Sequence, residues 1–252
     1  MHILVTNDDG IQATSLLALN QALMTVADTT VVAPSRNWSA SGHVKTMHKP
    51  LRVWETQLDD GVRAFASSGA PSDCVGLAFL GIVEQRIDMV VSGINQGPNL
   101  GHDVTYSGTV TAAMEGAIAG VPSIAVSLDS YQEADFGFAA RVAARLAQQV
   151  AQHGLPPETL LNVNVPALPE EEIAGLMVTR MGRRIYCDEL VRRADPKGRP
   201  YYWIGGQSPG GVLDEGTDLW ALANKYVSVT PLQLDLTDYE LIERVKAWDI
   251  SL

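Results

Sequence analysis

Short apolar runs that do not alternate with polar residues are the feature that most constrains how this sequence folds. They recur as ILVT at 3–6, TVVAP at 30–34, DMVVSG at 88–93, SIAVS at 123–127 and LNVNV at 161–165. Strands that are apolar on both faces belong to parallel sheets covered by helices. Segments with helical character lie between several of them, at 14–27, 72–82, 109–119 and 135–152. The alternation predicts an α/β three-layer sandwich around a mostly parallel sheet.

The sequence changes in character after about residue 175. The stretches RPYYWIGGQSPGG (199–211) and DEGTDLWALANKYVSVTPL (214–232) are rich in Gly, Pro and aromatic residues, and we interpret them as extended hairpins. Thr237 and Glu240 have the spacing of a capping box ahead of an amphipathic helix. We therefore predict an α/β catalytic core over 1–175. A C-terminal extension over 176–252 would hold a β-hairpin arm, a returning strand and a terminal helix.

The charge balance limits the classes of partner. The formal net charge is −11 over 252 residues, which argues against a stable nucleic-acid partner and against an anionic membrane surface. A small phosphorylated ligand remains compatible, because a metal ion or a helix N-terminus can supply local positive potential. The two cysteines, Cys74 and Cys187, show no metal-ligand spacing and favour a cytoplasmic protein. We expect neither a signal peptide nor a membrane span.

Polar residues follow the predicted strands at one edge of the sheet. NDDG follows the first strand, SRNWSASGH (35–43) the second and INQGPNLGHDVTYSGT (94–109) the strand at 88–93. Ligands bind open α/β sheets at the carboxyl ends of the strands. The sequence therefore predicts a binding site built from these loops.

Asp8 and Asp9 are adjacent carboxylates at the end of a strand that we expect to be buried. Enclosed carboxylates repel each other unless they share a proton, meet a basic partner or bind a cation. No Lys or Arg follows until Arg36, so a hard divalent cation bound through oxygen ligands is attractive. The alternative is that one Asp caps the next helix and the other faces water.

The loop from 93 to 109 is the second candidate feature. It offers glycines for close backbone approach, amide oxygens, and a Ser-Gly-Thr start to an Ala-rich helix, where free N–H groups suit a phosphate. The residues concerned are Gly93, Gly97, Gly101, Asn95, Asn99, Ser107, Gly108 and Thr109. The alternative is a tight loop with an ordinary helix cap.

Several reaction classes are excluded by missing motifs. The sequence lacks the dinucleotide fingerprint G-x-G-x-x-G in its first loop, a P-loop and a G-x-S-x-G nucleophile elbow. A response-regulator receiver needs an Asp at the end of its third strand, but Asp88 stands at the start of DMVVSG. A haloacid-dehalogenase-like phosphatase needs Asp-x-Asp. Metal-assisted hydrolysis of a phosphate ester remains, and a binding-only receiver or nucleotide sensor is the alternative.

Five motifs reach from the first strand to about residue 232: ILVTNDDG, VVAPSRNWSASGH, VVSGINQGPNLGHDVTYSGTVTAAMEGA, LNVNVP and YVSVTPL. In these motifs the sequence resembles the SurE (stationary-phase survival protein) family of nucleotidases. The resemblance implies a Rossmann-like α/β sandwich whose C-terminal extension exchanges between subunits of a homodimer or homotetramer. It also implies a metal-dependent acid phosphatase that hydrolyses nucleoside 5′- and 3′-monophosphates.

The resemblance also implies roles for individual residues. Carried over from the family, the ligands of one divalent cation per subunit, Mg²⁺ or Mn²⁺, are Asp8, Asp9, Ser39 and Asn95. Chemistry alone does not select Ser39, because the same loop offers Ser35 and Ser41. The catalytic residues would be Asp8, Asp9 and Asn95, and the substrate-binding residues Gly97, Asn99, Ser107, Gly108 and Thr109. The chain departs from the family pattern at Trp38, which replaces a charged residue, and at Lys225, where Gly is common.

Overall fold

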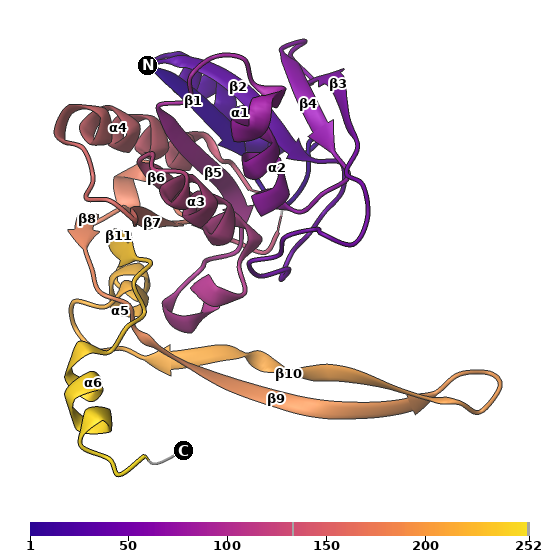
Figure 1. Ribbon diagram of the computed structural model, residues 1–252, viewed down its shortest axis with the longest axis vertical. Helices are drawn as coiled ribbons and strands as arrows, with labels where there is room; N and C mark the ends of the chain where they lie inside the picture. The colour runs from indigo at the N-terminus through magenta and orange to yellow at the C-terminus, as the bar shows by residue number, and fades with distance from the viewer. Residues whose placement is uncertain (133, 251–252) are drawn as a thin grey trace.

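The structure is a computed structural model that describes residues 1–132 and 134–250, and Figure 1 shows its two parts. An α/β core lies at the top, and a long two-stranded arm and a terminal helix project from below it. The core is built on one nine-stranded sheet with the order β3-β4-β2-β1-β5-β6-β7-β11-β8. Its central pairs are parallel, and only β3/β4 and β7/β11 are antiparallel. The predicted fold class is confirmed.

The strands of the sheet fall where the apolar runs lie, with additions at both edges. They are β1 (His2–Thr6), β2 (Asp28–Pro34), β3 (Val53–Gln57), β4 (Arg63–Ser67), β5 (Met89–Gln96), β6 (Ser123–Asp129), β7 (Thr159–Pro166), β8 (Gly175–Val178) and β11 (Tyr226–Gln233). Three strands, β3, β4 and β8, were not among the predicted strands. The sequence of β3, VWETQ, lacks a continuous apolar run, and β8 spans only the four residues GLMV.

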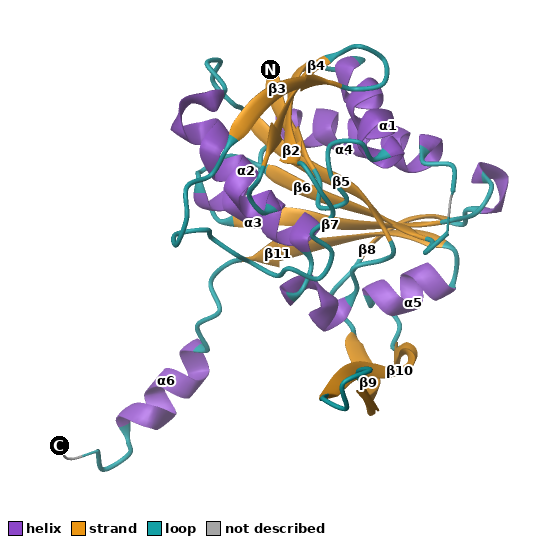
Figure 2. Ribbon diagram, turned by 90° about the vertical axis from the view of Figure 1, so that its right-hand side faces the viewer, coloured by secondary structure: helices purple, strands orange, loops and turns teal. Residues whose placement is uncertain are grey.

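Helices cover both faces of the sheet (Figure 2). One layer holds α1 (Thr14–Met24) and α4 (Gly137–His153), and the other holds α2 (Pro71–Leu77) and α3 (Gly108–Ile118). A five-residue π-helical turn, η1 (Ala78–Ile82), continues α2. Within β1, Ile3 and Val5 enter the core beneath α1 and α4, whereas Leu4 enters the core beneath α2 and α3. This double burial explains why the run ILVT is apolar without alternation.

The C-terminal segment departs from the sequence prediction at two points. The stretch 214–232 is not purely extended, because α5 (Asp218–Ala223) precedes β11, and Thr217 caps α5 by accepting from Trp220 N. The terminal helix α6 (Tyr239–Lys246) is capped by Asp238, which accepts from Leu241 N, and not by Thr237. Lys225 takes a left-handed φ of 65° in the turn before β11, a conformation that Gly adopts more easily.

The arm consists of β9 (Arg183–Ala194) and β10 (Pro200–Val212), paired antiparallel and separate from the main sheet. β11 lies within the main sheet between β7 and β8. The division of the chain into a core and an extension at residue 175 stays a prediction. Residue 133 of the predicted core and residues 251 and 252 of the predicted extension lie outside the described residues.

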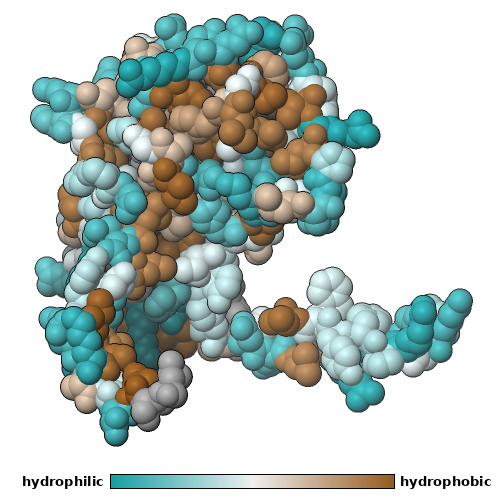
Figure 3. Space-filling model, viewed as in Figure 1, coloured by the Kyte–Doolittle hydropathy of each residue, from teal (hydrophilic) through white to brown (hydrophobic). Residues whose placement is uncertain are grey.

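Apolar side chains are exposed on the arm and on α6 (Figure 3). Trp203 and Ile204 in β10 are 63% and 81% exposed, and α6 has no buried residue. Across the described ranges 1–132 and 134–250, no helix combines the length and the apolarity needed to cross a membrane.

Candidate active site

The loops that follow β1, β2 and β5 meet the first turn of α3 around a cavity of about 250 Å³. Six of the residues expected in the site line it: Asp8, Ser39, Asn95, Gly97, Asn99 and Ser107. Gly108 and Thr109 lie behind Asp8, and Asp9 lies beside it on the loop. The structure thus brings the predicted residues together at the carboxyl edge of the sheet, where such sites form.

Asp8 is the most enclosed of these residues, with 2% of its surface exposed. The Thr109 hydroxyl donates a hydrogen bond to Asp8 Oδ1, and the backbone N–H groups of Gly108 and Thr109 also favour the charged carboxylate. Burial outweighs these contacts and raises the pKa of Asp8. The start of α3 therefore faces the Asp8 carboxylate in this structure.

Asp9 is half-buried and weakly held. Its Oδ1 accepts from Asn37 Nδ2 at 3.3 Å, and its Oδ2 accepts from Gln96 N at 3.4 Å. Burial, together with the neighbouring Asp8 charge, raises the pKa of Asp9 to about 6. Two adjacent carboxylates that both resist ionisation indicate a place where a cation is needed to balance charge.

The alternative that one Asp caps the next helix is wrong. α1 has Ala13 at its N-cap and no side-chain capping hydrogen bond. The residue that closes the loop is Asn7, whose side chain donates to Gly10 O at 3.0 Å and accepts from Gly10 N at 3.2 Å. The loop is thereby fixed without either carboxylate.

Asn95 and Ser39 offer neutral oxygen atoms to the same cavity. The Asn95 amide donates from Nδ2 to Gly97 O at 2.7 Å, which leaves its Oδ1 for another partner. Ser39 is positioned through its backbone, which donates to Asn37 Oδ1 at 2.7 Å. Carboxylate, amide and hydroxyl oxygens are the ligands that hard divalent cations prefer. The residues present therefore fit such a cation.

Within the described part of the chain, no group of three or more His, Cys, Asp or Glu side chains gathers as a metal site. The predicted ligand set contains only two acidic residues, and its other ligands are neutral oxygen atoms, so it does not count as such a cluster.

Besides Ser35 and Ser39, the loop after β2 contains a third serine, Ser41, which adds an oxygen atom near the site. Ser41 Oγ is buried without a hydrogen-bond partner among the described residues, and it lies 3.0 Å from where a Cβ on Gly108 would be.

Asn99 lines the cavity and is also a structural anchor. Its backbone N–H donates to Asn164 Oδ1 at 2.7 Å, and its Nδ2 donates to Ser127 Oγ at 2.8 Å. Its carbonyl oxygen accepts from Asn162 Nδ2 and Asn164 Nδ2 at 2.8 and 3.0 Å. Asn162 and Asn164 are fully buried in β7. Neither was among the predicted site residues, although both stand as polar residues inside the apolar run LNVNV.

A cluster from the arm also reaches the cavity, and no sequence signal pointed to it. Arg184 in β9 lines the cavity together with Asp103, which lies in η2 (Gly101–Thr105). Arg184 Nε lies 2.6 Å from Asp103 Oδ2, and Tyr186 OH donates to Asp103 Oδ1 at 2.7 Å. Asp218, which is fully buried, ties the two segments together by accepting from Gly101 N and Gly182 N.

Comparisons with known proteins identify the family to which the chain is related. The family model described as Survival protein SurE matches residues 3–188. The chain is 51% identical over 251 residues to 5′-nucleotidase SurE of Chloroflexus aggregans, covering 99% of each chain. It is 54% identical over 247 residues to the 5′-nucleotidase SurE of Herpetosiphon aurantiacus, covering 97% of each.

The fold is similar to a solved structure over almost its whole length. The crystal structure of the SurE protein from Aquifex aeolicus matches with a TM-score of 0.85 and 44% identity, covering 98% of each chain. The family match, the full-length identities and the shared fold all point the same way, and the chain belongs to the SurE family.

Proposed function

We propose that this protein is a metal-dependent phosphomonoesterase that hydrolyses nucleoside 5′- and 3′-monophosphates to nucleoside and phosphate. The observation that carries the proposal is the cavity at the carboxyl edge of the sheet, where Asp8, Ser39, Asn95 and Ser107 meet. The relatives named 5′-nucleotidase SurE match the chain over its full length, which supports the same activity.

In this proposal Asp8, Asp9, Ser39 and Asn95 hold one divalent cation, Mg²⁺ or Mn²⁺. Such a cation polarises the phosphoryl oxygens and stabilises the charge that develops on them. Asp8 is held in place by Thr109, and Asn95 by Gly97. Ligands whose orientation is fixed in this way bind a cation with little reorganisation.

In this proposal Ser107 contacts the phosphate. It is the N-cap of α3, and its Oγ accepts from Val110 N at 3.1 Å. Its own hydroxyl proton is then available to donate to a non-bridging phosphate oxygen. Asn99 and Gly97 complete the wall next to it, and the buried asparagines of β7 keep that wall rigid.

The test of this function is phosphate release from a panel of 5′- and 3′-nucleoside monophosphates, with Mg²⁺, with Mn²⁺ and after chelation. We expect turnover with added cation and its loss in chelator, because the two carboxylates alone offer no electrophile. Absence of release with every cation, from folded protein that still binds nucleotide, would favour the binding-only receiver or sensor instead.

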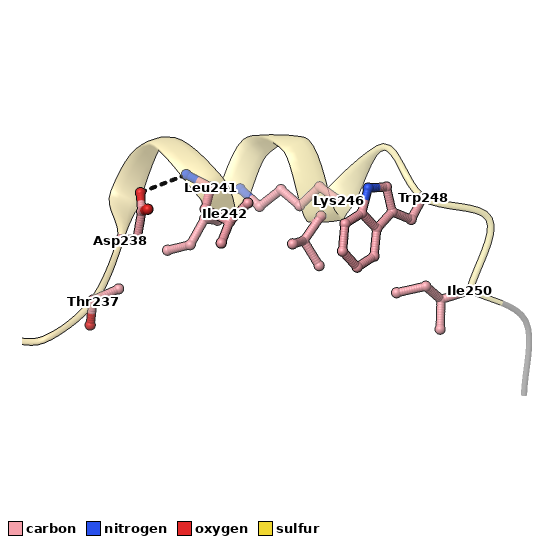
Figure 4. A pocket seen from close by; sticks show the side chains of 8 residues that line it. Thr237, Asp238, Leu241, Ile242, Lys246, Trp248 and Ile250 are labelled. Carbon is pink, nitrogen blue, oxygen red and sulfur yellow. Dashed lines mark hydrogen bonds between the residues drawn. The ribbon is translucent and has the colours of Figure 1, made fainter. Parts of the chain in front are cut away.

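We further propose that residues 176–252 serve homo-oligomerisation, as a dimer or tetramer. Figure 4 shows Leu241, Ile242, Trp248 and Ile250 on the terminal segment, where Asp238 caps the helix. No residue of α6 is buried. An amphipathic helix without a buried face is marginally stable alone, and burial against a second copy would stabilise it.

The free, exposed thiol of Cys187 in the arm supports a cytoplasmic location.

Replacing Trp203 by Asp tests this proposal. Trp203 is 63% exposed on the arm, and loss of an aromatic anchor from an interface is expected to weaken association roughly tenfold or more. Light scattering across a dilution series measures the change. The control is Leu80→Asp, since Leu80 is 86% exposed on η1 in the core. A wild-type chain that is monomeric at micromolar concentration would contradict the proposal.

A further inference from the structure

A second cavity of about 300 Å³ adjoins the active-site cavity. The two share Pro98, Tyr131, Arg184 and Pro209 as common walls. The first cavity is lined by polar residues such as Asp8 and Asn95. The second is lined largely by apolar residues from both the core and the foot of the arm: Leu100, Leu213, Leu219 and Leu222. A polar compartment next to an apolar one suits a ligand with a charged end and a flat aromatic end.

Arg184 lies at the junction of the two cavities. Its side chain is only 9% exposed. Its Nε donates to Asp103 Oδ2 at 2.6 Å, and its Nη1 donates to Pro209 O at 3.2 Å. A guanidinium carries more N–H donors than these two bonds use, and Nη2 makes no hydrogen bond to any described residue. Among the described residues, Arg184 Nη2 is not one of the buried atoms that lack a partner, so it is accessible and can donate to a ligand in the cavities that Arg184 lines.

The charge around Arg184 argues for a neutral acceptor. Asp103 forms a direct ion pair with it. Asp129 also lines the second cavity; burial raises the pKa of its carboxyl group, although the Arg184 charge acts in the opposite direction. The positive charge of Arg184 is thus already paired with one carboxylate, that of Asp103. The fork of donors remains suited to directed hydrogen bonds with sugar or base oxygen and nitrogen atoms.

The backbone around this junction is held in place. Asp218 accepts from Gly101 N at 2.8 Å and from Gly182 N at 2.7 Å, which joins the segment before Asp103 to the segment before Arg184. The ring of Tyr131 lies directly over Gly97, where an added Cβ would come within 2.5 Å of the ring. The Asp218 hydrogen bonds fix the backbone near Asp103 and Arg184, whereas the Tyr131 ring is 73% exposed. A backbone fixed in this way positions a ligand with little entropic cost.

Building on the proposed nucleotidase function, we propose that Arg184 is a specificity-determining residue that binds the nucleoside part of the substrate. The base then occupies the second cavity, between the core and the foot of the arm. The arm would thereby complete the substrate site of its own chain.

The experiment compares three phosphate esters at saturating cation: adenosine 5′-monophosphate, ribose 5-phosphate and phenyl phosphate. Phenyl phosphate keeps the reacting group and a flat ring but lacks acceptors beyond the phosphate. In Arg184→Met we expect KM for adenosine 5′-monophosphate to rise about 10–100-fold, because hydrogen bonds to a charged donor are lost. KM for phenyl phosphate is expected to stay within about twofold, because no acceptor of that ester contacts Arg184.

Two further variants separate recognition from folding. Arg184→Lys keeps the charge beside Asp103 but removes the planar fork, and it should also lose preference for the nucleotide. Arg63→Met is the control: it removes an exposed guanidinium from β4, where Arg63 pairs with Glu55, and it should leave all three KM values near wild type. If Arg184→Met does not fold, Arg184→Lys carries the comparison.

Equal losses for all three esters, or no change for any, would overturn the role of Arg184 while leaving the nucleotidase function in place. Failure of the wild-type protein to release phosphate from any ester would instead reject the proposed function. In that case calorimetry with adenosine 5′-monophosphate and with inorganic phosphate decides the role of Arg184. Arg184→Met should weaken binding of the nucleotide and not of phosphate, and any other pattern rejects the role.

Discussion

Asp8→Asn is expected to lower kcat/KM for nucleoside monophosphates by at least about 10³-fold, because several kcal/mol of cation-dependent stabilisation depend on this ligand. Asn keeps the shape of the side chain and an oxygen that accepts from Thr109. The charge that attracts the cation is lost. Phosphate release across a cation titration measures the effect.

When no cation is present, the same variant is expected to be thermally more stable than the wild type, although it is less active. Asp8 is almost fully buried, and burial raises the pKa of its carboxyl group despite the hydrogen bonds from Thr109 and Gly108. Ionisation of Asp8 is therefore costly when no cation is bound. An amide at that position removes the cost. Wild-type Tm should rise by roughly 5–10 °C when the cation is at about 100 times its Kd, and the variant should show little rise.

Asp59→Asn is the matched control. Asp59 lies exposed between β3 and β4, and the same chemical change there should leave activity and the response to cation unaltered. An Asp8→Asn protein that keeps cation-dependent turnover would show that Asp8 is not a ligand, and the site would have to be rebuilt around Asp9 and Asn95.

Gly108→Ala is expected to reduce kcat/KM by about 10²-fold with the fold retained. The added Cβ displaces the Asp8 carboxylate, and a misplacement of about 1 Å at a reacting centre has such an effect. A Cβ on Gly108 would lie 2.8 Å from Asp8 Cβ, 2.9 Å from Asp8 Oδ2 and 3.0 Å from Ser41 Oγ. These distances are shorter than ordinary contacts. The Asp8 carboxylate must therefore move from its place, and cation affinity should fall with activity.

Gly76→Ala in α2 is the control for that change. Its added Cβ would meet only Glu115 Oε1, at 3.9 Å. Replacing Gly by Ala in a helix without a clash stabilises a protein by about 0.4–1 kcal/mol, so activity should be unchanged and stability slightly higher. If Gly108→Ala binds cation and turns over substrate like wild type, the close approach of α3 to Asp8 is not required for function.

Helix and strand positions in the core followed from local pattern. The predicted helices at 14–27, 72–82, 109–119 and 135–152 correspond to α1, α2 with η1, α3 and α4. The five apolar runs correspond to β1, β2, β5, β6 and β7. Local pattern was misleading after residue 175. The segment DLWALA forms α5 because Thr217 caps it and Leu219 and Leu222 find partners in a small separate cluster with Leu100.

The candidate site was likewise predictable from the sequence only in part. Asp8, Ser39, Asn95 and Ser107 lie on loops that follow neighbouring strands, and strand order in a parallel sheet brings such loops together. Family resemblance, and not chemistry, selected Ser39. The asparagines of β7 were visible in the sequence as polar residues in an apolar run, but their partner Asn99 lies 63 and 65 positions away.

Arg184 marks the limit of what sequence can reveal here. It forms a hydrogen bond to Asp103, which lies 81 positions away in the sequence, and no sequence pattern near either residue indicates that contact. The sequence by itself determined the α/β class, the covered parallel sheet and the edge where the polar loops gather. Strands buried on both faces are runs of apolar residues, and such runs can be recognised in the sequence. Only the tertiary structure decided that the foot of the arm returns to that edge. Such a contact depends on how distant segments pack, and packing between distant segments leaves no periodic trace in either of them.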